Sequence, residues 1–256
     1  MGSLKIGVFV QNLELGVDEG LKKAAEIGAD GFQLYCTSGD LLPENMSKEA
    51  RDTFKKTYED LGLVLSATCC DYFTGLIDEE RNKELIPQVK ANIDQAVDLG
   101  TSIITTHIGF VPEDDTEPVW DILTKALKDV GQYAEDRGVT LATETGPEEG
   151  WVLAKLFERV GSKGISANFD PANFVMGKFD HMKAVEDLAP YITHSHAKDG
   201  KWGGKEVPLG EGDVNFPDYI KALKATGFDG YYIIERETGD NPVGDITMAL
   251  EYLRNF

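Results

Sequence analysis

Two kinds of hydrophobic pattern alternate along the chain. Short apolar runs rich in β-branched residues predict strands at Lys5–Val10, Gly31–Tyr35, Val64–Thr68, Ser102–His107, Val139–Glu144, Ile165–Asp170, Ile192–His196 and Tyr231–Glu235. Between these runs, apolar residues recur every three or four positions, which is the period of an amphipathic helix. The pattern is clearest in 80–99 and 216–227, where Asn215 is the expected N-cap of the second helix.

This alternation predicts the architecture. Dividing 256 residues among eight strand–helix units gives 32 residues per unit, a normal size for a βαβ repeat. No linker-like segment divides the chain, so one domain over 1–256 is expected. A doubly wound open sheet is the competing fold, but "VFVQNLELG" follows the first strand where a dinucleotide-binding sheet would carry G-x-G-x-x-G. We therefore predict a single (β/α)8 TIM barrel.

Candidate metal ligands stand at the ends of four consecutive predicted strands: Glu144, Asp170, His196 and Glu235. The active site of a (β/α)8 barrel lies at the carboxyl ends of its strands, so these side chains are expected to converge. Three carboxylates and one imidazole suit Mn²⁺, Mg²⁺ or Co²⁺ better than a sulfur-rich zinc site would.

Each of these residues also has an ordinary structural explanation. Asp170 precedes a proline and could be a turn residue, and a glutamate at a strand end is often a solvated charge. His194 and His196 share the parity of one strand, so one can bind metal while the other supports it. His107, which ends another strand, is either a substrate contact or a core histidine.

Composition limits the classes of binding partner and the cellular location that we expect. The sequence holds 45 acidic and 25 basic residues, a net charge of −20, which disfavours nucleic acid and anionic membrane surfaces as partners. No apolar run approaches the roughly 18 residues of a membrane helix, and "LKIGVFV" is too short for a signal-peptide core. Three cysteines without a CxxC motif are expected to be reduced and buried in a cytoplasmic protein.

Six segments together resemble the xylose isomerase-like TIM-barrel superfamily, the sugar phosphate isomerase/epimerase group that includes ketose 3-epimerases, inosose dehydratases and endonuclease IV-type enzymes. They are "THIGFVP", "ETGPEE", "NFDPANF", "HSHAKDG", "PLGEGDVNF" and "IIERETGD". They cover the last five strands and are specific for the superfamily more than for one reaction.

The resemblance implies roles for individual residues. It implies that Glu144, Asp170, His196 and Glu235 hold a divalent metal, with Mn²⁺ expected and Mg²⁺, Co²⁺ or Zn²⁺ as alternatives. It also implies that Glu144 and Glu235 are the catalytic carboxylates.

Three further positions concern the substrate. Lys198 and His107 match positions that commonly meet substrate oxygens. The family's epimerases often carry histidine where this chain has Asn173, which can bind a substrate hydroxyl but cannot carry a proton as imidazole does. That change also removes a second-metal ligand of the endonuclease-type relatives.

The expected function is metal-dependent isomerisation or epimerisation of a small ketose or keto-polyol through an enediolate. The alternatives are a lyase or dehydratase that acts on a keto-sugar or keto-inositol with the same metal site, and a non-catalytic sugar-binding barrel. "KDGKWGGKE" could line an anion pocket or form a lid, so the sequence leaves open whether the substrate is phosphorylated. Assembly into a homo-oligomer is left open as well.

Overall fold

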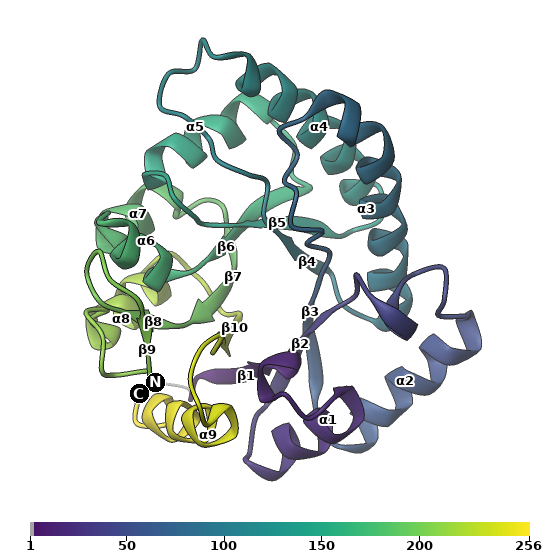
Figure 1. The fold of residues 1–256 in the computed structure, drawn as a ribbon, viewed down its shortest axis with the longest axis vertical. Helices are drawn as coiled ribbons and strands as arrows, with labels where there is room; N and C mark the ends of the chain where they lie inside the picture. Colours follow the sequence, from purple (N-terminus) through teal and green to yellow (C-terminus); the bar gives the residue numbers. More distant parts are fainter. Residues whose placement is uncertain (1–2) are drawn as a thin grey trace.

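The strands close into a barrel in the computed structural model, which describes residues 3–256 (Figure 1). The eight parallel barrel strands are β1 (Lys5–Phe9), β2 (Gly31–Tyr35), β3 (Val64–Cys69), β4 (Ile103–Thr106), β5 (Thr140–Glu144), β6 (Ile165–Phe169), β7 (Ile192–Ala197) and β10 (Tyr231–Ile234). They pair in the order β1-β10-β7-β6-β5-β4-β3-β2, and β2 closes the ring against β1. The predicted (β/α)8 barrel is confirmed.

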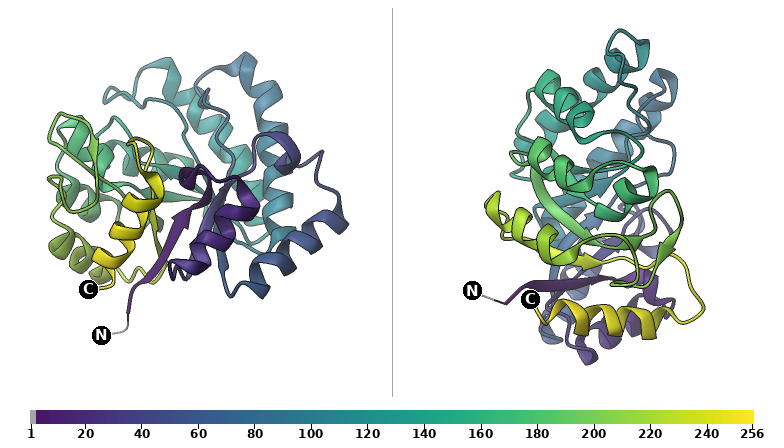
Figure 2. Two further views of the ribbon diagram at one scale, coloured as in Figure 1. Left: turned by 60° about the horizontal axis from the view of Figure 1, so that its bottom comes forward. Right: turned by 90° about the vertical axis from the view of Figure 1, so that its left-hand side faces the viewer.

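Helices surround the barrel and connect its strands (Figures 1 and 2). The α-helices are α1 (Val17–Glu26), α2 (Lys48–Asp60), α3 (Glu79–Leu99), α4 (Pro118–Glu135), α5 (Gly150–Val160), α6 (Pro171–Gly177), α7 (His181–Leu188), α8 (Phe216–Ala225) and α9 (Pro242–Leu253). Two short 3₁₀ helices, η1 (Val10–Leu13) and η2 (Gly39–Leu41), follow β1 and β2. No helix within residues 3–256 is long and apolar enough to cross a membrane.

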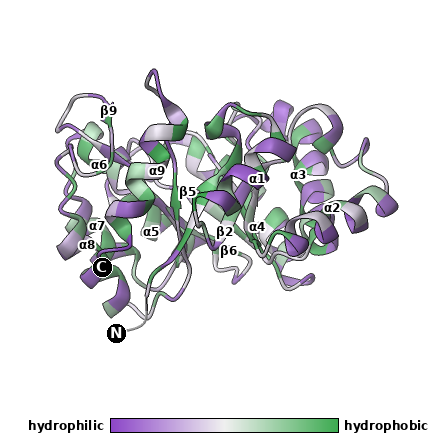
Figure 3. Ribbon diagram, turned by 90° about the horizontal axis from the view of Figure 1, so that it is seen from below, coloured by the Kyte–Doolittle hydropathy of each residue, from purple (hydrophilic) through white to green (hydrophobic). Residues whose placement is uncertain are grey.

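The main hydrophobic core lies between the strands and the helix ring. Trp120, Leu127 and Leu141, for example, are completely buried on α4 and β5. Burying one such side chain stabilises the fold by roughly 1.5–3 kcal/mol. Figure 3 shows hydrophobic residues along the central strands and hydrophilic ones over much of the helix surface. The barrel interior at the carboxyl ends of the strands is polar, so the core supports a polar site there.

The predicted strands match the observed ones to within one residue at either end. Asn215 caps α8 as expected, because its side chain accepts a hydrogen bond from the backbone N–H of Asp218. The sequence pattern did not predict the short antiparallel hairpin of β8 (Asp199–Gly200) and β9 (Glu206–Val207), which lies in the connection after β7. Two-residue strands are too short to show a period.

Candidate metal centre

The four predicted ligands come from four neighbouring strands. Glu144 is the last residue of β5, Asp170 follows β6 directly, His196 lies near the end of β7, and Glu235 follows β10. Because β5, β6, β7 and β10 are adjacent in the closed sheet, their carboxyl ends place the side chains at one level.

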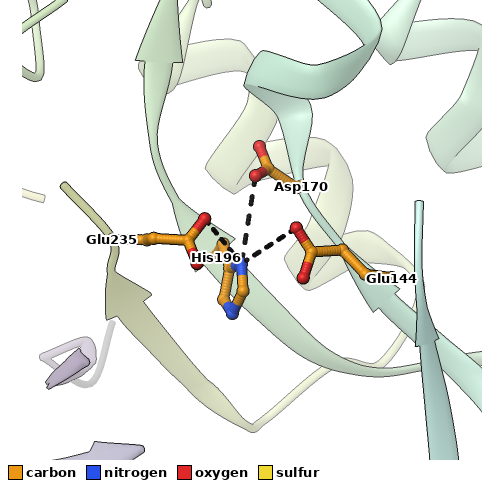
Figure 4. Close-up of side chains that lie close together, drawn as sticks. All are labelled: Glu144, Asp170, His196 and Glu235. Carbon is orange, nitrogen blue, oxygen red and sulfur yellow. Dashed lines mark ion pairs between the residues drawn. The ribbon is translucent and has the colours of Figure 1, made fainter. Parts of the chain in front are cut away.

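The side chains converge around the imidazole of His196 (Figure 4). Its Nδ1 lies 3.3 Å from Glu235 Oε2, 3.6 Å from Glu144 Oε1 and 3.9 Å from Asp170 Oδ2. One candidate ligand atom from each residue lies within 4.8 Å of the other three. Asp170 and His196 are completely buried, and Glu144 and Glu235 are almost so.

Two atoms at the centre of this cluster show that the residues suit a metal ion. Asp170 Oδ2 and His196 Nδ1 are buried and have no hydrogen-bond partner. A buried polar atom without a partner costs about 1–3 kcal/mol, so such atoms call for an explanation. A divalent cation between three carboxylates and one imidazole would satisfy both atoms and neutralise the clustered negative charge.

The second nitrogen of His196 is fixed by Gln33 on β2. Gln33 Oε1 lies 2.9 Å from His196 Nε2, and Gln33 Nε2 donates to Thr105 Oγ1 over 2.8 Å. The bond to Thr105 turns the amide oxygen toward the imidazole, which favours a hydrogen on Nε2 and makes Nδ1 the nitrogen that would bind a metal. Sequence analysis missed Gln33; its signal is a polar residue inside the buried run "GFQLY".

His194 has the supporting position expected for one of the two histidines. Its Nδ1 lies 2.8 Å from Asn168 Oδ1. This contact turns the Asn168 side chain so that its Nδ2 faces the cluster, 3.4 Å from Glu144 Oε2 and 3.2 Å from His196 Nε2. Burial holds the pKa of His194 well below its usual range. His194 is therefore neutral and donates through Nδ1.

Asn173 and Asp170 hold the carboxylates in place. The Asn173 amide donates to Glu144 Oε1 over 3.1 Å and to the carbonyl oxygen of Thr145 over 3.0 Å. Asp170 is the N-cap of α6, because its Oδ1 accepts from the backbone N–H groups of Ala172 and Asn173. This cap leaves Oδ2 of Asp170 to face the cluster.

Lys198 lies beside Glu235, and its Nζ is also 3.8 Å from Asp170 Oδ2. Its Nζ donates to Glu235 Oε2 over 2.8 Å and also bonds Glu237. Burial acts to lower the pKa of Lys198, but the carboxylates of Glu235 and Asp170 outweigh burial and hold the pKa well above its usual range. Lys198 is thus a fixed cation next to a predicted catalytic carboxylate.

His107 forms an ion pair with a residue that sequence analysis missed. Its Nδ1 lies 2.6 Å from Oδ2 of the buried Asp71, and its Nε2 lies 3.6 Å from Glu144 Oε1. The charge of Glu144, followed by the bond to Asp71, raises the pKa of His107 to about 9. The side chain of His107 is 47% exposed, so it meets solvent at the mouth of the site. Asp71 follows a predicted strand in "TCCDYF", as the four candidate ligands stand at the ends of theirs, and this position is the signal that could have identified it.

Aromatic rings extend from the cluster toward the loops after β1, β2 and β3. Phe9 lies 6.1 Å from the His196 ring and stacks on Tyr35 at 4.4 Å, and Phe73 lies 6.1 Å beyond Tyr35. Phe73 is 78% exposed and has a φ of 58°. A cavity of 340 Å³ adjoins these rings and is lined by Gln11, Tyr35, Thr37, Ser38, Asp71, Tyr72 and Phe73.

Known proteins share both the sequence pattern and the fold. An inosose dehydratase from Geobacillus thermodenitrificans is 24% identical over 271 residues, which cover 90% of this chain and 87% of that protein. An L-ribulose-5-phosphate 3-epimerase from Salmonella paratyphi B is 39% identical, but only over 67 residues, or 25% of this chain. The crystal structure of a xylose isomerase domain protein from Planctomyces limnophilus has a TM-score of 0.87 and 27% identity, covering 99% of this chain and 96% of that one.

The family profile described as "Xylose isomerase-like TIM barrel" matches residues 21–256, which is most of the chain. Its match includes all four residues of the candidate centre. The chain therefore belongs to the xylose isomerase-like TIM barrel family.

Proposed function

We propose that the protein is a divalent-metal-dependent isomerase or epimerase of a small ketose or keto-polyol, acting through an enediolate. The observation that carries the proposal is the placement of Glu144 and Glu235 on opposite sides of His196 (Figure 4). Two carboxylates that face each other across a site can reach both faces of one substrate carbon. Glu144, Asp170, His196 and Glu235 would hold the metal, for which Mn²⁺ suits the oxygen-rich set.

The bound ion would supply Lewis-acid polarisation of the substrate carbonyl. The protein's own groups would manage the protons. One glutamate removes the proton next to the carbonyl, and the other returns a proton to the opposite face, which gives epimerisation. If a single carboxylate carries the proton between adjacent carbons, the result is isomerisation. Lys198 and His107, cations on either side of the cluster, can donate hydrogen bonds to oxygens that gain negative charge.

Dehydration is the second candidate, because an inosose dehydratase is similar over nearly the whole chain. The same proton abstraction starts both reactions. In a dehydration the enolate electrons expel a β-hydroxyl group, which takes up a proton and leaves as water. His107 lies next to Glu144 and is partly exposed, so it can supply that proton. The masses of substrate and product then differ by one water, which distinguishes the two reactions.

Solvent hydrogen exchange tests the proposal. The protein is treated with a chelator, reloaded with Mn²⁺ and incubated in D₂O with ketoses and keto-inositols, and deuterium in the recovered sugar is measured by mass spectrometry. We expect exchange that needs the metal and is lost in Glu144→Gln, while the exposed Glu158→Gln on α5 serves as the control. Sugar binding without exchange, unchanged by Glu144→Gln, would instead identify a non-catalytic sugar-binding barrel.

A further inference from the structure

The loops after the last two barrel strands decide whether the site can accept an anionic substrate. In (β/α)8 barrels, phosphate groups commonly bind to backbone N–H groups of these loops and to the N-terminus of a nearby helix. Here the loops follow β7 and β10. Their glycines and lysines would fit such a phosphate site, so the partners of their N–H groups are informative.

The backbone N–H groups after β7 bind the protein's own Asp199. Oδ1 of this carboxylate accepts from Gly200 and Val214, and Oδ2 accepts from Gly210 and Gly212, over 2.8–3.2 Å. Asp199 is 1% exposed. A Cβ atom on Gly212 would lie 1.8 Å from Asp199 Oδ1, so glycine is required there for the carboxylate to approach. An internal anion therefore fills the pocket that these amides form.

A second carboxylate fills the loop after β10. Glu206 of the β8–β9 hairpin accepts hydrogen bonds from Arg236 Nη1 over 2.6 Å and from the backbone N–H of Glu237 over 3.2 Å. Arg236 is also paired with Asp245 in the first turn of α9, at 2.8 Å. The arginine and amide of this loop are thus already neutralised by buried or nearly buried acids.

The N-termini of the two following helices are occupied in the same way. Asn215 caps α8 and Asn241 caps α9, each accepting from a backbone N–H of its own first turn. Asp218 and Asp245 add a negative charge to these first turns. The helix dipoles therefore interact with the protein's own oxygens and carboxylates.

The cavity on the opposite side of the mouth has polar and aromatic walls, and His107 beside it is paired with Asp71. The residues that line the 340 Å³ cavity include one carboxylate, that of Asp71, and no lysine or arginine. An adjoining groove over α1 and α2 is lined by Asp18, Asp40 and Glu49, also without a lysine or arginine. Tyr35 and Phe73 offer ring faces, and Gln11, Thr37 and Ser38 offer hydrogen-bonding groups. Sugar hydroxyls and C–H faces match this lining, whereas a phosphate would find no lysine or arginine in the cavity and would face the carboxylates of the adjoining groove.

We propose that the substrate is uncharged, a free keto sugar or keto polyol and not a phosphate ester. The inference rests on the proposed function and specifies its substrate class. The reacting carbons lie at the metal centre, and the remote hydroxyls lie in the cavity between Tyr35 and Phe73. Lys198 is bound by Glu235 and Glu237 at the metal centre, and Lys201 and Lys205 are exposed, so the loop after β7 has no buried cation away from the centre for a remote phosphate.

Paired substrates test this inference on the intact, Mn²⁺-loaded enzyme. Each ketose or keto-polyol in the deuterium-exchange assay is compared with its terminal phosphate ester. We expect kcat/KM to be at least about 100-fold higher for the free sugar, since bringing like charges together costs several kcal/mol. Exchange that favours the phosphate esters would leave the proposed function standing and overturn the uncharged substrate. Exchange with neither member of any pair would refute the proposed function and this inference with it.

A second measurement needs no variant and no phosphorylated sugar. Sulfate, a phosphate mimic, is added to the reaction of the best free sugar, with chloride at equal ionic strength as the control. We expect sulfate to leave the KM unchanged relative to chloride. Competitive inhibition by sulfate would show an accessible anion site in the substrate pocket and would contradict the inference.

Discussion

Replacing Gln33 with methionine should weaken metal binding although Gln33 does not belong to the predicted ligand set. His196 Nε2 has two polar neighbours, Gln33 Oε1 at 2.9 Å and Asn168 Nδ2 at 3.2 Å. The first is an acceptor and favours a hydrogen on Nε2, while the second is a donor and favours a bare Nε2. In Gln33→Met only the donor remains. His196 would then carry its hydrogen on Nδ1, the nitrogen that faces the cluster.

The expected magnitude follows from this change of tautomer. Loss of a partner that orients a ligating histidine typically lowers metal affinity by about 10- to 100-fold. Factors of this size correspond to about 1.4–2.8 kcal/mol of binding free energy. The metal-free protein should change less, because Asn168 can still satisfy Nε2 and methionine fills similar space. The loss should therefore appear mainly in metal binding.

The affinity for Mn²⁺ is measured by titration, in which the electron paramagnetic resonance signal gives the concentration of free ion. Thermal unfolding in chelator measures the cost to the fold. Gln95→Met is the matched control, because Gln95 is equally buried but lies on α3 and bonds the carbonyl oxygen of Leu41. Thr105→Val should give a smaller effect of the same sign, since it removes the group that orients Gln33. Unchanged Mn²⁺ affinity in Gln33→Met would refute this account of the tautomer.

Three further changes probe the surroundings of the centre. Lys198→Met should lower kcat by about 100-fold while Mn²⁺ binding is retained, because the metal ligands stay and a cation beside Glu235 is lost; equal loss of Mn²⁺ binding would contradict this role. Phe73→Ala should raise KM more than it lowers kcat, and the exposed Val64→Ala at the amino end of β3 should change neither. Burial raises the pKa of Glu148 from 4.5 to about 7. Ionisation of Glu148 therefore lowers the free energy of unfolding progressively between about pH 4.5 and pH 7, and the whole loss is present above pH 7. Thermal unfolding should therefore show Glu148→Gln gaining stability relative to wild type between pH 4 and pH 8, by up to about 3 kcal/mol; a pH-independent difference would rule out the shift.

The barrel and the convergence of the four candidate ligands were predictable because both follow from local pattern and topology. Parallel strands buried on both faces give continuous apolar runs, and a polar residue where such a run stops is conspicuous. Glu144, Asp170, His196 and Glu235 were all found in this way. Closure of the barrel then brings neighbouring strand ends together without further information.

The residues that orient and limit the site could not be predicted, because their roles depend on contacts across the barrel. Gln33 bonds His196 over a separation of 163 residues. The glycines of "KDGKWGGKEVPLGEGDV" were compatible with an anion pocket, and only the fold shows that Asp199 binds the N–H groups of Gly200, Gly210 and Gly212. Sequence identifies an amide-rich loop, but not the anion that fills it.

Asn173 has a further consequence for the proton chemistry of the proposed reaction. Family epimerases often carry histidine at this position, whereas the Asn173 amide donates to Glu144 Oε1 and cannot exchange that proton. This bond holds Glu144 Oε1 in a fixed position at the edge of the cluster. On the other side of the same oxygen, at 3.6 Å, lies His107 Nε2, part of an imidazole paired with Asp71 and open to solvent. Because the pKa of His107 is raised to about 9, this imidazole is protonated, and in the proposed reaction it would donate a proton beside Glu144 rather than accept one. The imidazole next to Glu144 therefore comes from the residue after β4, while the residue at the start of α6 is an amide that cannot carry a proton.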